Sequence, residues 1–175
     1  GPAALGGCPD GDGDGLADIE DDCPSVPGDA QNRGCPTYKT IKVKTDRIEL
    51  DGKIFFAYDK TEILPKSHEL LDEIAQALID HPAIRVRVMG HTDASGSEKH
   101  NLELSDGRAR AVVDYLVGKS IDAGRLEAKG FGSQYPVDSN KTQSGRENNR
   151  RVEFLIVKES AASPSEGASG ESQGQ

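Results

Sequence analysis

The chain has 175 residues, of which 34% are hydrophobic and 29% are charged, and its net charge is −9. The low apolar share predicts that part of the chain lies outside any core. No apolar run approaches the roughly 20 residues that span a bilayer, so we expect contact with a membrane only through an anchor upstream of this sequence.

The negative charge is concentrated at the two ends. Residues 1–36 hold 8 acidic and 1 basic residues, residues 37–158 hold 19 and 20, and residues 159–175 hold 3 and none. Because no basic face dominates, a nucleic-acid partner is excluded.

The same shifts in composition divide the chain into four parts. Residues 1–7 read as a linker that begins with a Gly-Pro cleavage scar. An acidic unit follows at 8–36, and then a domain at 37–158. The tail at 159–175 has no Leu, Ile, Val or Phe, and we predict that it is disordered.

The acidic unit has almost no apolar residues, so a metal ion or a disulfide must order it. Its carboxylates fall at the spacing of a calcium loop, with the carbonyl of Leu16 as a further ligand: Asp10, Asp12, Asp14, Asp18 and Asp21. Prolines beside Cys8 and Cys23 exclude the two helices of an EF-hand. We therefore predict bound calcium. A solvated acidic linker is the simpler alternative.

The spacing from Asp10 to Pro24 resembles a thrombospondin type 3 repeat, which is a calcium-wrapped module without a hydrophobic core. The segment from Cys23 to Pro36 resembles the disulfide loop that follows such repeats in outer-membrane proteins. This resemblance implies a disulfide between Cys23 and Cys35, and hence an oxidising compartment. Cys8 is then left over.

Residues 37–158 predict one α/β domain, an α+β sandwich with two main helices on one face of a mixed sheet. Alternating apolar residues such as Val86 and Val88 indicate strands, and the spacing of Leu71, Ile74 and Leu78 indicates a helix. The predicted order is strands at 40–50 and 53–58, a helix at 66–80, a strand at 84–89, a helix at 98–117, a strand at 126–131, a short helix at 144–149 and a strand at 152–157.

Asp93 follows the end of a predicted strand, and Arg108 lies 15 residues later in a predicted helix. If the helix packs back across the strand, the two side chains converge on one pocket. A carboxylate beside a guanidinium fork suits a ligand that carries an ammonium and a carboxylate, as an amino-acid end does. A salt bridge that merely ties the helix to the loop is the alternative on spacing alone.

The run from Thr92 to Ala109, with Gly130-Phe131-Gly132 and Asn149-Arg150-Arg151, is similar to the OmpA C-terminal-like family over about residues 50–157. The resemblance implies a β-α-β-α-β-β fold in the periplasm that binds peptidoglycan at diaminopimelate and attaches the outer membrane to the wall. It implies that Asp93 takes the diaminopimelate ammonium and that Arg108 takes its carboxylate. The pocket would be completed by Thr92, Asn101, Leu104 and Arg151.

Two other functions are weighed against this one. A flagellar stator-type anchor shares the binding fold, but the calcium repeat argues against it. A metal-dependent peptidoglycan hydrolase would need ligands such as His91, Asp93 and His100, whose spacing is loose. We expect that the chain is not an enzyme, and we expect Arg150 to be a solvated charge.

Overall fold

The computed structural model of the protein describes residues 5–157. The proposed Gly-Pro scar and the tail that was predicted to be disordered lie outside these residues. The strands are β1 (Ile41–Val43), β2 (Arg47–Leu50), β3 (Arg85–His91), β4 (Leu126–Gly130) and β5 (Arg151–Val157). The α-helices are α1 (His68–Asp80), α2 (Glu98–Gly118) and α3 (Gln143–Asn149). Short 3-10 turns occur at Ala30–Asn32, Pro65–Ser67 and Ala123–Arg125.

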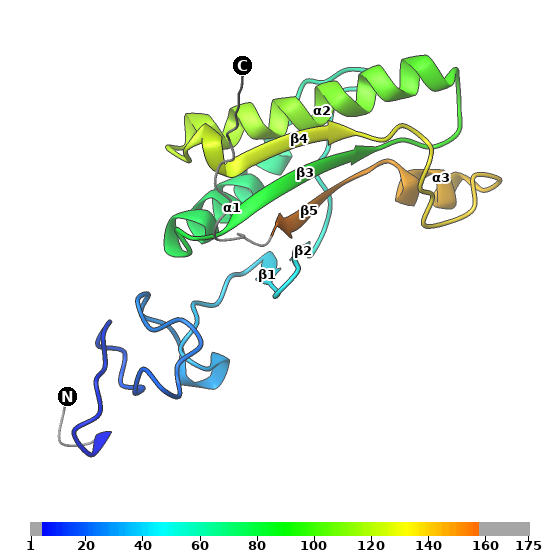
Figure 1. The fold of residues 1–175 in the computed structure, drawn as a ribbon. Helices are drawn as coiled ribbons and strands as arrows, with labels where there is room; N and C mark the ends of the chain where they lie inside the picture. Colours follow the sequence, from blue (N-terminus) through cyan, green and yellow to red (C-terminus); the bar gives the residue numbers. More distant parts are fainter. Residues whose placement is uncertain (1–4, 158–175) are drawn as a thin grey trace, which may run out of the picture.

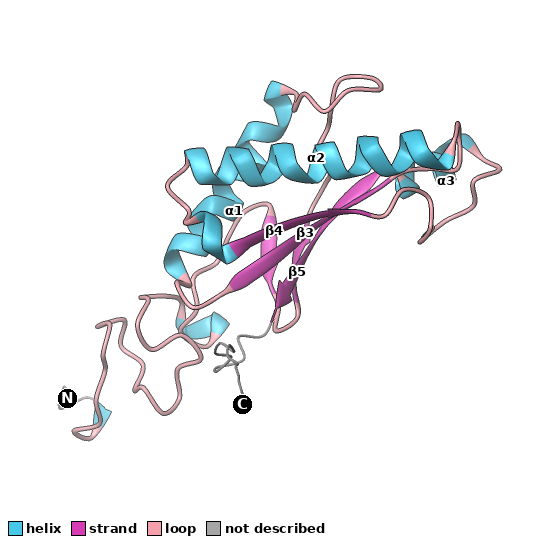
Figure 2. Cartoon of the chain, turned by 45° about the horizontal axis from the view of Figure 1, so that its top comes forward, coloured by secondary structure: helices cyan, strands magenta, loops and turns pink. Residues whose placement is uncertain are grey.

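The five strands form one mixed sheet in the order β1-β2-β5-β3-β4. Strands β3 and β4 run parallel, and the remaining neighbours run antiparallel. Helices α1 and α2 cover the same face of this sheet (Figures 1 and 2). The predicted fold class, a mixed sheet with two main helices on one face, is confirmed.

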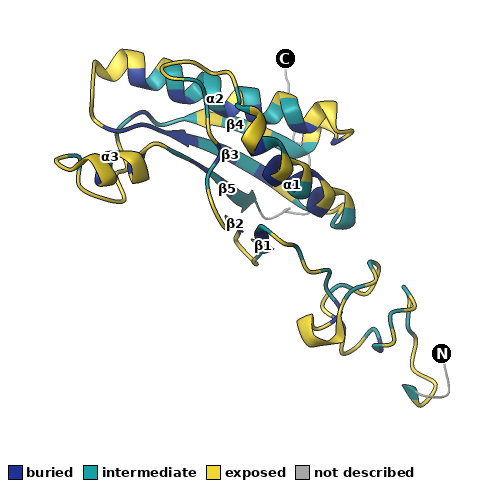
Figure 3. Ribbon diagram, turned by 180° about the vertical axis from the view of Figure 1, so that it is seen from behind, coloured by how far each residue is buried: buried dark blue, intermediate teal, exposed yellow. Residues whose placement is uncertain are grey.

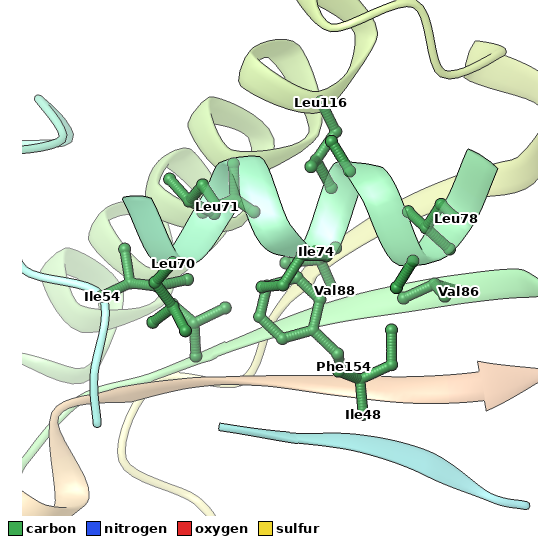
Figure 4. Close-up of a cluster of buried hydrophobic side chains, with 14 of the residues drawn as sticks. Ile48, Ile54, Leu70, Leu71, Ile74, Leu78, Val86, Val88, Leu116 and Phe154 are labelled. Atoms are coloured by element: carbon green, nitrogen blue, oxygen red, sulfur yellow. The ribbon is translucent and has the colours of Figure 1, made fainter. Parts of the chain in front are cut away.

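The core lies between that face of the sheet and the two helices (Figure 4). Alternate strand residues point to the same side, which places Ile48, Val88 and Phe154 beneath α1. The buried helix positions repeat every three or four residues, as at Leu71 and Ile74. Each of these five side chains is at most 3% exposed, and burying one stabilises the fold by about 1.5–3 kcal/mol.

Two predicted strands differ from the observed elements. The predicted strand at 40–50 is a hairpin of β1 and β2, because the chain reverses where the amide of Lys44 donates to the carbonyl of Arg47 at 2.8 Å. The predicted strand at 53–58 is wrong: residues 51–64 form a loop with one isolated bridge, between Phe56 and Ile63. The apolar character of this loop reflects packing, since Ile54 is buried in the core.

Two glycines let α2 lie unusually close to the sheet. A Cβ atom on Gly90 would come within 2.2 Å of the carbonyl oxygen of Ser105, and one on Gly130 within 2.2 Å of the amide of Asp106. Neither position therefore tolerates a larger residue without displacing the helix. Ser105 is fully buried, and its Oγ accepts from the amide of Gly132 at 2.9 Å. This contact ties the first half of α2, which includes Arg108, to the segment that follows β4.

Residues 5–36 contain short 3-10 turns but no strand and no α-helix, and they lie to one side of the sheet (Figure 1). Most of this segment is exposed (Figure 3), with Ala17 and Asp21 among its few buried residues. The implied disulfide between Cys23 and Cys35 is present, and Cys8 is a free, exposed thiol. Across residues 5–157 the structure has no helix that is both long enough and apolar enough to span a bilayer.

Candidate ligand-binding site

A cavity of about 850 Å³ opens where β3 ends and β5 begins. Its walls come from the 51–64 loop, the loop after β3, the first half of α2 and the end of α3. All the residues that the sequence analysis assigns to a ligand pocket line this cavity: Thr92, Asp93, Asn101, Leu104, Arg108 and Arg151. The fold thus brings together residues that are up to 59 positions apart in the sequence.

Asp93 is the buried carboxylate of the cavity, with only 6% of its surface exposed. Its Oδ1 accepts from the amide of Ser95 at 2.7 Å, and its Oδ2 accepts from Arg150 Nη1. Burial alone would raise the pKa of Asp93, but the hydrogen bonds from Ser95 and Arg150 outweigh it and hold the pKa below its usual value. Asp93 is therefore an anion at neutral pH.

The loop that carries Asp93 is fixed by neighbouring polar side chains. Asn101, which is 4% exposed, donates from Nδ2 to the carbonyl oxygen of Ser95 at 3.0 Å. Thr92 Oγ1 donates to the carbonyl oxygen of Asp93 at 2.8 Å. The amide of Ala94 donates to Asn140 Oδ1 at 3.2 Å. In this structure Thr92 and Asn101 position the loop, and a ligand would meet a site that is already ordered.

Arg108 extends from α2 to the cavity, where its guanidinium is held by contacts with the 51–64 loop. Its Nε donates to the carbonyl oxygen of Lys60 at 2.8 Å, and its Nη2 donates to that of Ala57 at 3.4 Å. The guanidinium carbon lies 4.9 Å from the centroid of the Phe56 ring. Burial lowers the pKa of Arg108, yet a guanidinium stays charged at any pH at which the protein is folded.

No ion pair joins Asp93 to Arg108, so the simpler alternative of a helix-to-loop salt bridge between these two is wrong. The partner of Asp93 is Arg150, and the expectation that Arg150 is only a solvated charge is therefore corrected. Its side chain is 40% exposed and lines the cavity.

Arg151 borders the cavity, but its guanidinium is used elsewhere. It donates to the Glu153 carboxylate, to the carbonyl oxygen of Tyr135 at 2.9 Å and to that of Asn149 at 3.3 Å. Alternation along β5 explains the difference between the two arginines, because Val152 and Phe154 face the helices and Arg151 faces the other way. Position 150 has the parity of the core-facing residues, and this signal was available in the sequence.

Further cavity residues come from the loop that was predicted as a strand. Lys53 is half-buried, and its Nζ donates to the carbonyl oxygen of Glu147 at the end of α3. Burial and the charge of Arg150 lower the pKa of Lys53. Phe55 and Tyr58 also line the cavity, and Tyr58 is 95% exposed. These residues were not predicted from the sequence, because a strand at 53–58 would have placed them in the sheet.

The histidines near the cavity are not arranged as metal ligands with Asp93. His91 is 5% exposed and stacks on Phe131 with 5.5 Å between ring centroids. Burial and the charge of Arg151 lower the pKa of His91 to about 4. His100 is exposed and bonds to Asp59 at 2.8 Å. Over residues 5–157, the one group of three side chains that fits a metal lies in the N-terminal unit.

That group consists of Asp10, Asp12 and Asp14, each of which offers a carboxylate oxygen within 4.8 Å of the others. Asp12 Oδ2 is buried and accepts no hydrogen bond, as expected of an oxygen that could bind a cation. Asp18 and Asp21 lie outside this group. Asp18 accepts from the amide of Gly11 at 2.7 Å, and Asp21 accepts from that of Cys23 at 2.7 Å while its Oδ2 is also buried without a hydrogen bond. The structure thus gathers three of the five predicted carboxylates, and these three fit a hard cation.

Comparison with known proteins agrees with this architecture. Residues 55–150 match the OmpA family. Outer membrane porin F of Pseudomonas aeruginosa is 36% identical over 155 residues, which cover 87% of this chain and 43% of the porin. Outer membrane protein A of Bordetella avium is 38% identical over 135 residues, which cover 77% of this chain and 67% of that protein. The chain thus spans less than half the length of the porin.

Among solved structures, the peptidoglycan-associated lipoprotein of Burkholderia pseudomallei is similar with a TM-score of 0.57 and 28% identity, over 60% of this chain and 89% of the lipoprotein. Two of these relatives are outer-membrane proteins by name and the third is a peptidoglycan-associated lipoprotein, which agrees with the predicted localisation. None of the three is named as an enzyme. With the family match over residues 55–150 and the shared mixed sheet and helices, the chain belongs to the OmpA family.

Proposed function

We propose that the protein binds peptidoglycan non-covalently through the diaminopimelate residue of the stem peptide and anchors the outer membrane to the cell wall. The observation that carries this proposal is the pairing of an ionised carboxylate, Asp93, with a guanidinium, Arg108, in one cavity without a bond between them. The end of the diaminopimelate side chain carries one ammonium and one carboxylate. These are the complements of Asp93 and Arg108.

The hydrogen bonds around Arg108 support its role as the carboxylate receptor. Two backbone carbonyls and the Phe56 ring hold the guanidinium in place while part of its donor fork is left for a ligand. Because the guanidinium is already ordered, it loses little side-chain entropy on binding. A larger part of the free energy of each hydrogen bond therefore contributes to affinity. Leu104 is the apolar wall beside the fork, and it suits the aliphatic part of diaminopimelate.

The same arrangement accounts for selectivity. Diaminopimelate differs from lysine by one carboxylate at the end of the side chain. A lysine-containing stem peptide would satisfy Asp93 but would leave Arg108 without its partner, which costs affinity. We therefore expect discrimination between the two kinds of peptide to depend on Arg108, whereas Asp93 contributes to both.

Binding at a single site should be weak and still suffice for anchoring. Two or three charge-assisted hydrogen bonds of about 1.5–3 kcal/mol each, less the cost of ordering the ligand, correspond to micromolar to millimolar dissociation constants. A protein held at a membrane faces a wall polymer with many identical sites, which raises the effective concentration.

We further propose that residues 8–36 form a thrombospondin type 3-like calcium repeat and that residues 37–158 form the wall-binding domain. In this arrangement the repeat is a semi-rigid spacer between an upstream membrane anchor and the wall. The three close carboxylates of Asp10, Asp12 and Asp14 support bound calcium, and the Cys23–Cys35 disulfide closes the loop that follows. The acidic repeat favours the outer-membrane anchor over a flagellar stator-type protein.

The test is a two-dimensional NMR titration with stem peptides that contain either diaminopimelate or lysine. We expect shifts around residues 91–108 with the first peptide and much weaker binding of the second. Arg108→Lys, which keeps the charge but loses the planar fork, should reduce the difference between the two peptides. Equal binding of both peptides to the unmodified protein would refute the diaminopimelate assignment.

A further inference from the structure

Four lysine and arginine side chains line the cavity, and only two of them form an ion pair. Of its four lysine and arginine side chains, Arg150 pairs with Asp93 and Arg151 pairs with Glu153. Within residues 5–157, no carboxylate oxygen lies within 4.0 Å of Lys53 Nζ or of the Arg108 guanidinium. Two cations at this site therefore lack an anionic partner.

The other acidic side chains of the cavity act on these two cations only from beyond ion-pair distance: the charge of Asp59 raises the pKa of Arg108, and that of Glu147 raises the pKa of Lys53. Asp59 is exposed and bonds to His100 at 2.8 Å. Glu147 is exposed, and its contact with Lys53 is made by its backbone carbonyl rather than by its carboxylate. Lys53, which lines the cavity, thus reaches from the loop after β2 to α3, where its ammonium donates to a backbone carbonyl oxygen.

A diaminopimelate end cannot supply the missing negative charge by itself. Its ammonium and carboxylate together are neutral, so its binding leaves the net charge of the cavity unchanged. Once the ligand ammonium approaches Asp93, Arg150 must share that carboxylate. Lys53 and Arg150 are both partly removed from water. With the Asp93 carboxylate shared with the ligand ammonium, neither cation would then have an anion of its own, which is unfavourable. In the free protein, burial and the charge of Arg150 already lower the pKa of Lys53, and the charge of Glu147 offsets this only in part.

We propose that Lys53 and Arg150 form a second subsite that binds a free carboxylate on the residue next to diaminopimelate in the stem peptide. In peptidoglycan that residue is a γ-linked glutamate whose α-carboxylate is either free or amidated, and the subsite selects the free form. The cavity of about 850 Å³ has room for more than one amino-acid end. This inference rests on the proposed function and extends it from one residue of the ligand to two.

The experiment is a set of titrations with two diaminopimelate tripeptides that differ only by carboxylate or carboxamide at the glutamate. Both are titrated by NMR into the unmodified protein, into Lys53→Gln and into Lys42→Gln. Lys42 is an exposed residue of β1 that lines no part of the cavity, so its variant is the matched control. Arg150→Gln is less suitable, because it would also release Asp93.

In the unmodified protein and in Lys42→Gln, we expect the carboxamide to bind about 10-fold more weakly, as for the loss of one charge-assisted hydrogen bond. In Lys53→Gln, the affinity for the free-carboxylate peptide should fall by a similar factor, whereas that for the carboxamide peptide should change little. The change in the protein and the change in the peptide are then energetically coupled. Equal binding of both peptides to the unmodified protein, with shifts around residues 91–108, would overturn the subsite and leave the proposed function standing. Binding of neither peptide at millimolar concentration would overturn both.

Discussion

The N-terminal unit and the α/β domain are ordered by different means. In the domain, apolar side chains of the helices, such as Ile74, pack against apolar side chains of the sheet, such as Phe154. In residues 8–36, carboxylates accept hydrogen bonds from nearby amides, as Asp10 does from Gly13 at 2.8 Å, and a disulfide closes the final loop. The contrast teaches that one short chain can combine a region stabilised by hydrophobic burial with one that depends on covalent and electrostatic contacts. Each region should therefore respond to a different perturbation.

The largest effect should follow from a cavity in the core. Phe154→Ala removes a side chain that is 1% exposed and should lower the free energy of unfolding by about 3–5 kcal/mol. Chemical denaturation measures the loss. Amide exchange in residues 8–36 should be unchanged under conditions where the variant remains folded. Faster exchange in that segment would mean that the two regions share their stability.

The next effect is a pH dependence confined to the domain. The pKa of His91 is lowered to about 4, whereas an unfolded histidine titrates near 6.5. Between these values the unfolded chain binds more protons than the folded one, so stability falls as the pH drops from about 6.5 to 4. The loss amounts to about 3 kcal/mol.

His91→Phe keeps a ring against Phe131 but does not titrate. The slope of unfolding free energy against pH should therefore be smaller in this variant over the same window. Identical slopes in the variant and the unmodified protein would contradict the assignment to His91.

Loss of the disulfide should have a smaller effect, limited to the other region. Replacing Cys23 and Cys35 by serine opens a loop with a sequence separation of 12 residues. For a loop of this size the chain-entropy estimate is about 3 kcal/mol, and engineered pairs usually give less. Amide exchange in residues 8–36 should accelerate while the thermal midpoint of the domain stays within about one degree. A lower midpoint would show that the unit supports the domain.

The smallest effect on the whole protein should come from removal of calcium. Chelation should loosen residues 8–36, because Asp10, Asp12 and Asp14 would repel one another without a cation. Asp14→Asn should weaken the response, and Asp29→Asn, which alters a carboxylate outside that group, should not. Amide exchange with and without chelator is the measurement. No change in the unmodified protein would count against bound calcium.

The sequence predicts the domain well where the periodicity is strong. The helices and the strands at β3, β4 and β5 lie within a few residues of their predicted bounds, because alternation and helical spacing reflect burial directly. The prediction of a strand at 53–58 is wrong because apolar residues report burial and not the kind of element. Ile54 is apolar because it packs into the core from a loop, and a short apolar run does not distinguish a loop from a strand.

The sequence predicted which residues line the candidate site better than it predicted which of them contact one another. Asp93 and Arg108 line one cavity, as their spacing suggested. The roles of Arg150 and Arg151 required the strand parity of β5, and Lys53 required the path of a loop whose course depends on tertiary packing. In the N-terminal unit, the spacing alone did not reveal that Asp18 lies outside the group of three close carboxylates and accepts from the amide of Gly11.

Co-sedimentation with isolated diaminopimelate-type peptidoglycan tests most directly whether Arg108 binds the wall. Arg108→Ala is compared with Arg110→Ala, which removes an exposed arginine of the same helix that pairs with Asp106 and lines no part of the cavity. We predict that Arg108→Ala loses binding by 10-fold or more, as for loss of a charge-assisted carboxylate contact, with its cooperative melt retained, and that Arg110→Ala binds normally. Normal sedimentation of a folded Arg108→Ala variant would contradict the account.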